Sequence, residues 1–529
     1  MTLKSNMTRT VGRCAVVGLI ALPLGGAVLA QAQPMVSAAD EQACAVLAER
    51  PPADVRITRA AVTPGGTAWA GEPPAGAGPR RPSAPVNASF CRVQGVIEKE
   101  IGFELWLPIG KAWNGKFLGA GVGGDAGSFN FQDLPRGVNR GYAAATTDAG
   151  HKAADREWML GDPQRLTNYE LRANHLLAVK AKAIVQAYYA APPKYSYFIG
   201  CSGGGRQGLK EMQRFATDYN GVIAGASGPR TPEMTTRRMW EIIQRDTHPD
   251  LMSPADWRLV SQAGVERCDQ LDGVKDGVAE DPRHCRFDVA ELLCRGDKTA
   301  SCLTPQQVAF AKSFYAPLID ENGRKIDEGI LPGVLIDSGR SQLALGSFGR
   351  AVRKQSNWNG EGFRPGADLA ALRRVMPELA ADDPDLAPFR GAGGKAILYT
   401  GWMDGAVSAR MVTDYYDQVV KTAGGKAQAD QFSRLYMLPG VFHCGGGPGP
   451  DRVGGGGADA PVVDAKHDML AALEAWVERG QPPSDLVVSK VEEGRVTRRR
   501  KLCPYPQIAR YKGAGDTDDQ ASFECGNPA

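Results

Sequence analysis

Residues 195–214 (YSYFIGCSGGGRQGLKEMQR) pass from an aromatic, β-branched run through a glycine cluster into a helix-forming run. The first run predicts a strand and the last a helix, so the glycines form a sharp turn at the carboxyl end of a strand. Within the turn, residues 200–204 (GCSGG) fit G-x-S-x-G, the pattern of a nucleophile elbow in an α/β fold. Ser202 holds the central position and Cys201 lies off centre, so the pattern indicates the serine as nucleophile.

Expected strands and helices alternate on both sides of this turn, which favours a mostly parallel sheet with helices on both faces. The alternation stops near residue 229 and resumes at 395, so the residues between are interpreted as an insertion into one α/β domain. Residues 60–85, rich in Ala, Pro and Gly, are expected to be irregular. The sequence predicts strands at 116–118, within 142–151 and at 195–200, 221–226, 395–401 and 434–440, and helices at 169–189, 206–215, 407–421 and 463–479.

The charges nearly balance in the 529 residues, with 62 Lys and Arg against 59 Asp and Glu. No basic stripe with interleaved aromatic residues occurs, so no nucleic-acid partner is expected.

The N-terminus has the layout of a secretory signal peptide. Basic residues precede an apolar run at 14–30, and small residues follow at Ala30 and Ala32. The alternative is a membrane anchor, but the run is too short and too interrupted by proline and glycine for a good spanning helix. We expect residues 1–32 to be a signal peptide, and the mature chain to be secreted or periplasmic and not attached to a membrane.

Eleven cysteines occur, of which Cys14 lies in the expected signal peptide. An even number of cysteines in an exported chain predicts disulfides, here five. No C-x-x-C pair occurs, which disfavours a zinc site. The remaining cysteines are Cys44, Cys91, Cys201, Cys268, Cys285, Cys294, Cys302, Cys444, Cys503 and Cys525.

A serine nucleophile needs a histidine base and a carboxylate that orients it, in the chain order Ser, acid, His in α/β-hydrolases. His443 and Asp404 each follow an expected strand, where the catalytic groups of open α/β sheets gather. By itself Asp404 is better explained as part of a turn-forming Asp-Gly pair. His467 falls in an expected helix and is interpreted as a surface residue. The order along the chain favours a triad of Ser202, Asp404 and His443.

The thiol beside the nucleophile then has an explanation. Cys201 precedes Ser202 and Cys444 follows His443. If the serine and histidine come within hydrogen-bonding distance, a disulfide between their neighbours becomes geometrically plausible. The alternative is two free, buried thiols.

The chain resembles the tannase and feruloyl esterase family, which includes the enzyme that hydrolyses mono(2-hydroxyethyl) terephthalate. The matching stretches are WNGKFLGAGVGG, TTDAGH, YFIGCSGGGRQGL, CDQLDGVKDGV, ILYTGWMDGAVSA, FHCGGGPG and CPYPQIARYKGAGD. The resemblance implies an α/β-hydrolase core at 33–229 and 386–529 and a lid domain at 230–385. It also implies the triad Ser202, Asp404 and His443 and the disulfides Cys201–Cys444, Cys44–Cys91, Cys268–Cys285, Cys294–Cys302 and Cys503–Cys525.

The glycine loop at 119–127 has two interpretations. Gly119, Gly121 and Gly124 fit G-x-G-x-x-G and Asp148 follows another expected strand, as in nicotinamide oxidoreductases. Export argues against that class, and it leaves the order of the triad unexplained. The resemblance implies instead that the Gly124 N–H serves an oxyanion hole beside the Gly203 N–H.

Three carboxylates in the insertion raise the question of a metal. Asp269, Asp272 and Asp276 do not have the alternating spacing of an EF-hand loop, and a solvated acidic loop is equally consistent with them. The resemblance implies a structural Ca²⁺ site completed by the backbone carbonyls of Val274 and Val278. No organic cofactor is expected.

Together these features predict a secreted serine carboxylic-ester hydrolase that acts on small aromatic esters of the feruloyl or galloyl type through an acyl-enzyme on Ser202. The alternatives are a terephthalate half-ester hydrolase, a nicotinamide oxidoreductase and a non-catalytic, calcium-stabilised binding protein. Gly203 departs from the half-ester enzyme, which has a glutamate there. Aromatic residues of the insertion that are candidates for the acyl pocket are Trp240, Trp257, Phe314, Tyr315, Phe348, Trp358 and Phe363.

Overall fold

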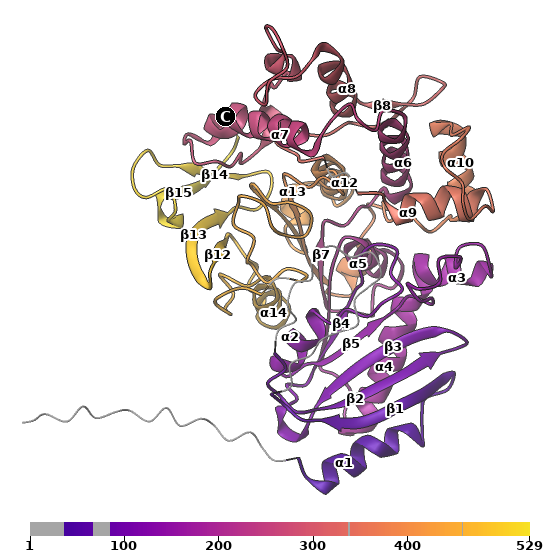
Figure 1. Ribbon diagram of the computed structural model, residues 1–529. Coiled ribbons are helices and arrows are strands. Elements are labelled where there is room, and N and C mark those ends of the chain that lie inside the picture. Colours follow the sequence, from indigo (N-terminus) through magenta and orange to yellow (C-terminus); the bar gives the residue numbers. More distant parts are fainter. Residues whose placement is uncertain (1–35, 67–84, 337–338, 458, 529) are drawn as a thin grey trace, which may run out of the picture. The chain divides into compact units, whose positions relative to one another are not determined.

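The computed structural model describes residues 36–66, 85–336, 339–457 and 459–528 (Figure 1). The expected signal peptide at 1–32 lies outside the described residues, as do residues 67–84 of the stretch expected to be irregular. Within the described ranges no helix is long and apolar enough to cross a membrane.

The core is a sheet that has nine strands among the described residues, in the order β1-β2-β3-β5-β4-β6-β7-β10-β11. From β5 to β11 in this order neighbouring strands run parallel, whereas β1, β2 and β3 form an antiparallel edge. The expected α/β class, with a mostly parallel sheet and an α/β-hydrolase core, is confirmed. The strands are β1 (Val55–Thr63), β2 (Phe90–Ile97), β3 (Ile101–Pro108), β4 (Lys116–Ala120), β5 (Ala143–Thr147), β6 (Tyr195–Cys201), β7 (Gly221–Gly225), β10 (Lys395–Gly401) and β11 (Ser433–Leu438).

The helices connect the strands and cover both faces of the sheet (Figure 1). Those outside residues 230–385 are α1 (Ala38–Ala45), α2 (Asp133–Asn139), α3 (Pro163–Thr167), α4 (Ala173–Tyr189), α5 (Gly203–Arg214), α11 (Ala387–Gly391), α12 (Ala409–Thr422), α13 (Lys426–Ala429) and α14 (Met469–Arg479). The C-terminal part adds two hairpins, formed by β12 (Leu486–Glu492) with β13 (Arg495–Leu502) and by β14 (Ile508–Tyr511) with β15 (Phe523–Gly526).

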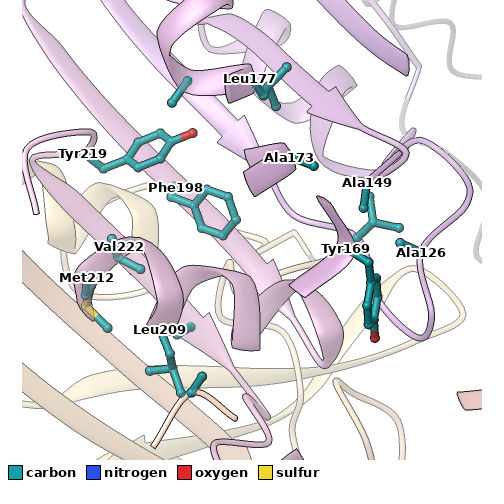
Figure 2. Packing of buried hydrophobic residues seen from close by; sticks show 14 of the residues in the cluster. Ala126, Ala149, Tyr169, Ala173, Leu177, Phe198, Leu209, Met212, Tyr219 and Val222 are labelled. Atoms are coloured by element: carbon teal, nitrogen blue, oxygen red, sulfur yellow. The ribbon is translucent and has the colours of Figure 1, made fainter. Parts of the chain in front are cut away.

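Strand β6 shows how the sequence builds the two layers. Side chains of a strand alternate between the faces of the sheet. Phe198 belongs to a core cluster with residues of α4 and α5 (Figure 2). Its neighbours Tyr197 and Ile199 belong to a second cluster that includes residues of α2 and α14. Because β6 is buried on both faces, the turn that follows it starts from the carboxyl end of a central, well-packed strand.

Residues 230–385 contribute no strand to this sheet among the part that is described. The segment holds α6 (Thr231–Thr247), α7 (Pro254–Cys268), α8 (Pro305–Tyr315), α9 (Gln342–Leu345), α10 (Pro365–Val375) and a separate pair of short strands, β8 (Leu318–Ile319) and β9 (Lys325–Asp327). It has its own hydrophobic cluster, which includes Trp257, Phe314 and Leu303.

The structure corrects three expectations about elements. Residues 60–63, expected to be irregular, belong to β1, because pairing with β2 rather than residue preference sets this edge. The helix expected from 169 begins as an α-helix at Ala173, after a π-helical turn at Asn168–Arg172. The helix expected from 463 begins at Met469, because the Asp468 side chain accepts a hydrogen bond from Ala471 N and caps it.

Candidate active site

Ser202 stands at the turn between β6 and α5. Its backbone has φ 61° and ψ −124°, a region that residues with a side chain rarely adopt. A Cβ on Gly200 would collide with the carbonyl oxygen of Gly204, so the strand and the helix approach each other as closely as two glycines allow. This strained turn is the local geometry that G-x-S-x-G predicts.

The three expected catalytic side chains form one hydrogen-bonded chain. His443 Nε2 lies 2.7 Å from Ser202 Oγ, and His443 Nδ1 lies 2.8 Å from Asp404 Oδ2. Asp404 follows β10 and His443 follows β11, which are neighbouring parallel strands. The site therefore has the geometry in which histidine can take the proton of the serine hydroxyl.

Asp404 is fixed as well as buried, at 2% exposure. Its Oδ1 accepts hydrogen bonds from the backbone N–H groups of Ala406 and Val407, both at 2.8 Å. The other oxygen, Oδ2, is thereby turned towards His443. Asp404 is thus the carboxylate that orients the imidazole, whereas His467 lies apart from the site, with Nδ1 2.8 Å from Asp464 Oδ1.

A disulfide joins Cys201 to Cys444 across 243 positions, with 6.0 Å between the Cα atoms. It ties the residue before the serine to the residue after the histidine, and in the loop-entropy model a crosslink over so long a loop stabilises the fold by roughly 5 kcal/mol. All five disulfides pair as the resemblance implies; the other four are Cys44–Cys91, Cys268–Cys285, Cys294–Cys302 and Cys503–Cys525.

Ser202 opens into a cavity of about 330 Å³ that the sheet edge and the 230–385 segment line together. Four arginines line it, and no aspartate or glutamate is among its described lining residues. The lining residues are Gly124, Tyr169, Ser202, Gly203, Arg206, Ser227, Gly228, Thr231, Met234, Arg238, Ile242, Arg245, Gly339, Arg340, Ser341, Leu343, Ala406 and Val407.

Gly124 and Gly203 meet beside Ser202. A Cβ on Gly203 would lie 2.7 Å from the carbonyl oxygen of Gly124, so the two backbones are nearly in contact. Gly124 has φ +62°, which favours glycine. The glycine loop therefore lies against the first turn of α5, where the resemblance places the oxyanion hole.

The expectation that aromatic residues of the insertion form the acyl pocket is wrong for the cavity that contains Ser202. Trp257 and Phe314 are buried in the cluster of the insertion and Phe348 in the main core, because burial of large apolar surface stabilises these clusters. Trp240, Tyr315, Trp358 and Phe363 pack against the same clusters.

The residues that sequence reasoning missed lie on one face of α6. Thr231, Met234, Arg238, Ile242 and Arg245 all line the cavity and follow helical spacing. This face carries both polar and apolar residues, so the sequence shows no apolar stripe by which it could be recognised. Only the position of the helix beside the cavity that contains Ser202 distinguishes this face from a solvent-exposed one.

The predicted calcium ligands lie in one stretch of the chain, and two of them, Asp272 and Asp276, are ion-paired with Arg500, which is fully buried. Arg500 contacts Asp276 directly and lies 3.8 Å from Asp272 and 3.4 Å from Glu280. Asp269 accepts hydrogen bonds from the backbone of Asp276 and Gly277. No group of three or more His, Cys, Asp or Glu side chains in the described ranges is placed to hold a metal ion as the side chains stand.

Even so, the carboxylates of this loop are not all satisfied. Asp272 Oδ2, Asp276 Oδ1 and Glu280 Oε1 are buried and have no hydrogen-bond partner. Burial raises the pKa of Asp272 to about 7 and that of Glu280 to about 8, against the lowering effect of Arg500. Buried oxygens without partners are a donor set that fits a hard cation.

Comparisons with known proteins agree with the site. The family model of tannase and feruloyl esterase matches residues 86–344 and 351–526. An uncharacterized esterase of Xanthomonas campestris pv. campestris is 34% identical over 486 residues, which cover 83% of this chain and 84% of that protein. A mono(2-hydroxyethyl) terephthalate hydrolase of Piscinibacter sakaiensis is 33% identical over 544 residues, covering 85% and 87%. The crystal structure of feruloyl esterase B from Aspergillus oryzae superposes with a TM-score of 0.85 at 26% identity, covering 92% of this chain and 99% of that one.

Proposed function

Because the chain belongs to the tannase and feruloyl esterase family, we propose that it is a secreted or periplasmic serine esterase that hydrolyses small esters of aromatic acids, of the feruloyl or galloyl type. The protein is a carboxylic ester hydrolase, since its relatives over most of its length are esterases. The observation that carries the serine mechanism is the hydrogen-bonded chain from Ser202 through His443 to Asp404.

The reaction follows from that chain. Ser202 Oγ attacks the ester carbonyl carbon while His443 Nε2 takes the hydroxyl proton, and Asp404 stabilises the imidazolium that forms. The N–H groups of Gly124 and Gly203 donate to the oxygen on which negative charge develops. The tetrahedral intermediate collapses to the acyl-enzyme as His443 gives its proton to the departing alcohol. Water, deprotonated by His443, then attacks the acyl carbon; the bond to Ser202 Oγ breaks as His443 returns the proton to that oxygen, and the acid leaves.

Hydrolysis of methyl ferulate tests this proposal. Ser202→Ala is expected to lower kcat by at least about 10⁴-fold, because no other group supplies the nucleophile. Circular dichroism and the melting temperature should match those of the wild type. A folded variant that retains activity would contradict the proposal.

A terephthalate half-ester is a second candidate substrate, favoured by the guanidinium of Arg245, which lines the cavity. A half-ester carries a free carboxylate, which guanidinium groups bind well. The test compares mono(2-hydroxyethyl) terephthalate with its methyl ester, which lacks the charge and is larger by one methyl group, and it follows release of ethylene glycol because the methyl ester is a second scissile bond. This candidate requires kcat/KM to be at least tenfold higher for the anion; equal values would exclude it.

Residues 230–385 are proposed to be the lid domain of this enzyme. Thr231, Arg245 and Leu343 line the same cavity as Ser202, which supports the assignment. The segment then shapes the space for the acyl or alcohol group without supplying a group of the triad.

For the acidic loop we propose a structural Ca²⁺ ion held by Asp269, Asp272 and Asp276 and by the carbonyls of Val274 and Val278. The buried oxygens Asp272 Oδ2 and Asp276 Oδ1, which have no hydrogen-bond partner, support it. When bound, the ion would neutralise charge that burial otherwise disfavours. A chelator should lower the melting temperature, and added Ca²⁺ but not Mg²⁺ should restore it; an unchanged melting temperature would count against the ion.

A further inference from the structure

We propose that Tyr169 is a positioning residue for the oxyanion hole: its hydroxyl holds the glycine loop at Gly124, and Arg206 joins it to the nucleophile helix α5. The inference rests on the proposed function, because it concerns how the two amide donors of that mechanism are kept in register.

The two donors come from separate parts of the chain. Gly203 begins α5 directly after Ser202, whereas Gly124 belongs to the loop between β4 and α2. A glycine at φ +62° has no side chain to anchor it, so its position depends on bonds to its backbone and to its neighbours. Donors must be held within a few tenths of an ångström to stabilise developing charge well, which makes the anchoring of Gly124 part of the mechanism.

Several side chains hydrogen-bond to the backbone of this loop, and two of them do so at Gly124 or within two residues of it. Gln207 Oε1, from α5, accepts a hydrogen bond from Val122 N at 2.9 Å. Tyr169 Oη donates to the carbonyl oxygen of Gly124 at 3.2 Å. The tyrosine thereby fixes one of the two peptide planes that meet at the Cα of Gly124, and the other plane carries the N–H of the oxyanion hole.

Tyr169 is itself held firmly. It is 2% exposed and lies in the π-helical turn Asn168–Arg172, an irregularity that often marks functional sites. Its ring lies 5.2 Å from that of Trp158, and Figure 2 places it in the main hydrophobic core with Ala126 and Ala149.

Arg206 completes the connection to the nucleophile. Its backbone N–H donates to Ser202 O at 2.9 Å, in the first turn of α5. Its guanidinium donates to the carbonyl oxygens of Tyr169 at 3.1 Å and Glu170 at 3.0 Å, and lies 4.8 Å from the centre of the Tyr169 ring. Arg206 is 1% exposed, so these contacts are shielded from water and worth more than on the surface. One path of contacts thus runs from Ser202 through Arg206 and Tyr169 to Gly124.

The test is Tyr169→Phe, which removes the hydroxyl and keeps the ring over Arg206. Removal of a whole oxyanion donor typically lowers kcat about 100- to 1,000-fold. A donor that is only loosened costs less, so we expect kcat for methyl ferulate to fall roughly tenfold with KM within twofold of the wild type. A trifluoromethyl ketone analogue adds Ser202 Oγ to give a hemiketal oxyanion, so its affinity should fall by the same factor. Ferulate, the product, forms no oxyanion at this position, so its affinity should not change.

Tyr189→Phe is the matched control. Tyr189 Oη also donates to a backbone carbonyl, that of Pro108 at 2.6 Å, and its ring stacks on Trp113, away from the cavity. Both variants lose one tyrosine hydrogen bond, so a merely structural role predicts similar losses of melting temperature and unchanged kinetics. The proposal requires the loss of kcat and of ketone affinity in Tyr169→Phe alone.

Two outcomes would overturn the inference: a kcat of Tyr169→Phe within twofold of the wild type, or a loss of ferulate affinity as large as that of the ketone. The activity of Ser202→Ala distinguishes failure of the positioning role from failure of the proposed mechanism. If Ser202→Ala is inactive and Tyr169→Phe behaves as wild type, only the positioning role is wrong. If Ser202→Ala stays active, the proposed function itself is wrong.

Discussion

The cavity has two walls that differ in construction. The wall from the sheet edge is made of backbone at turns: the elbow at Ser202 and the glycine loop at Gly124, held by buried hydrogen bonds. The opposite wall, from residues 230–345, presents side chains of one face of α6, among them Arg238 and Arg245. We infer that the first wall carries out the reaction and the second selects the substrate, so changes in the first should affect kcat and changes in the second KM.

The largest effect is expected from Asp404→Asn. Oδ1 would keep its two backbone donors, so the amide NH₂ would face His443 Nδ1 and hold the imidazole in the tautomer that cannot take the serine proton. A change of this kind lowers kcat about 10⁴-fold. Asp464→Asn is the matched control, since Asp464 bonds His467 on the surface in the same way. A kcat for Asp404→Asn within tenfold of the wild type would contradict a catalytic role for the Asp404 carboxylate.

Gly203→Ala should come next. The added methyl would lie 2.7 Å from Gly124 O and 3.0 Å from Val122 O, so the glycine loop must move. Because that displaces an oxyanion donor, we expect kcat to fall about 100-fold with little change in KM. Gly161→Ala is the control, because nothing lies within 4 Å of its added Cβ. Equal kcat and KM for the two variants would show that the glycine loop can move without loss of activity.

Glu170 links the core to the 230–385 segment, because its Oε2 accepts a hydrogen bond from Glu378 N at 2.8 Å. Burial raises the pKa of Glu170 from 4.5 to about 7. The folded state therefore binds the proton more tightly, and the free energy of unfolding falls as pH rises from about 4.5 to 7 and levels off above. The shift corresponds to about 3 kcal/mol.

Glu170→Gln cannot titrate but keeps an acceptor for Glu378 N. The difference in free energy of unfolding between wild type and variant should therefore move by about 3 kcal/mol in favour of the variant between pH 4.5 and 8. Urea unfolding at several pH values measures it. Parallel curves for the two proteins would mean that Glu170 is not protonated in the folded state near neutral pH.

The smallest effect concerns the opposite wall. If the substrate is a half-ester, Arg245→Gln should raise KM for mono(2-hydroxyethyl) terephthalate about tenfold, through loss of a charge-assisted contact. The methyl ester of that compound should be hydrolysed as before. A fall in kcat for both substrates would contradict the division between the two walls.

The two walls also differ in how far the sequence predicts them. Ser202, Asp404 and His443 were found because parallel strands bring their carboxyl ends to one edge, and strand ends can be recognised locally. The sequence analysis proposed no strand at β2 or β3, although both are rich in β-branched and aromatic residues, whereas residues 60–63 of β1 were misjudged because pairing with β2, not residue preference, fixes them. Tyr169 and the α6 residues were missed because they lie in a π-helical turn and on a helix face of mixed polarity, which have no local signature in the sequence. The aromatic residues of the insertion were misassigned because composition does not separate a pocket from a core.

Labelling of the nucleophile tests the central claim most directly. A fluorophosphonate should react with the wild type at one site, and mass spectrometry should place the phosphonyl group on Ser202, with fluoride released. Asp404→Asn should react far more slowly, and Ser202→Ala should remain unlabelled. A label on any other residue, or equal labelling of Ser202→Ala, would contradict the assignment of Ser202 as the nucleophile.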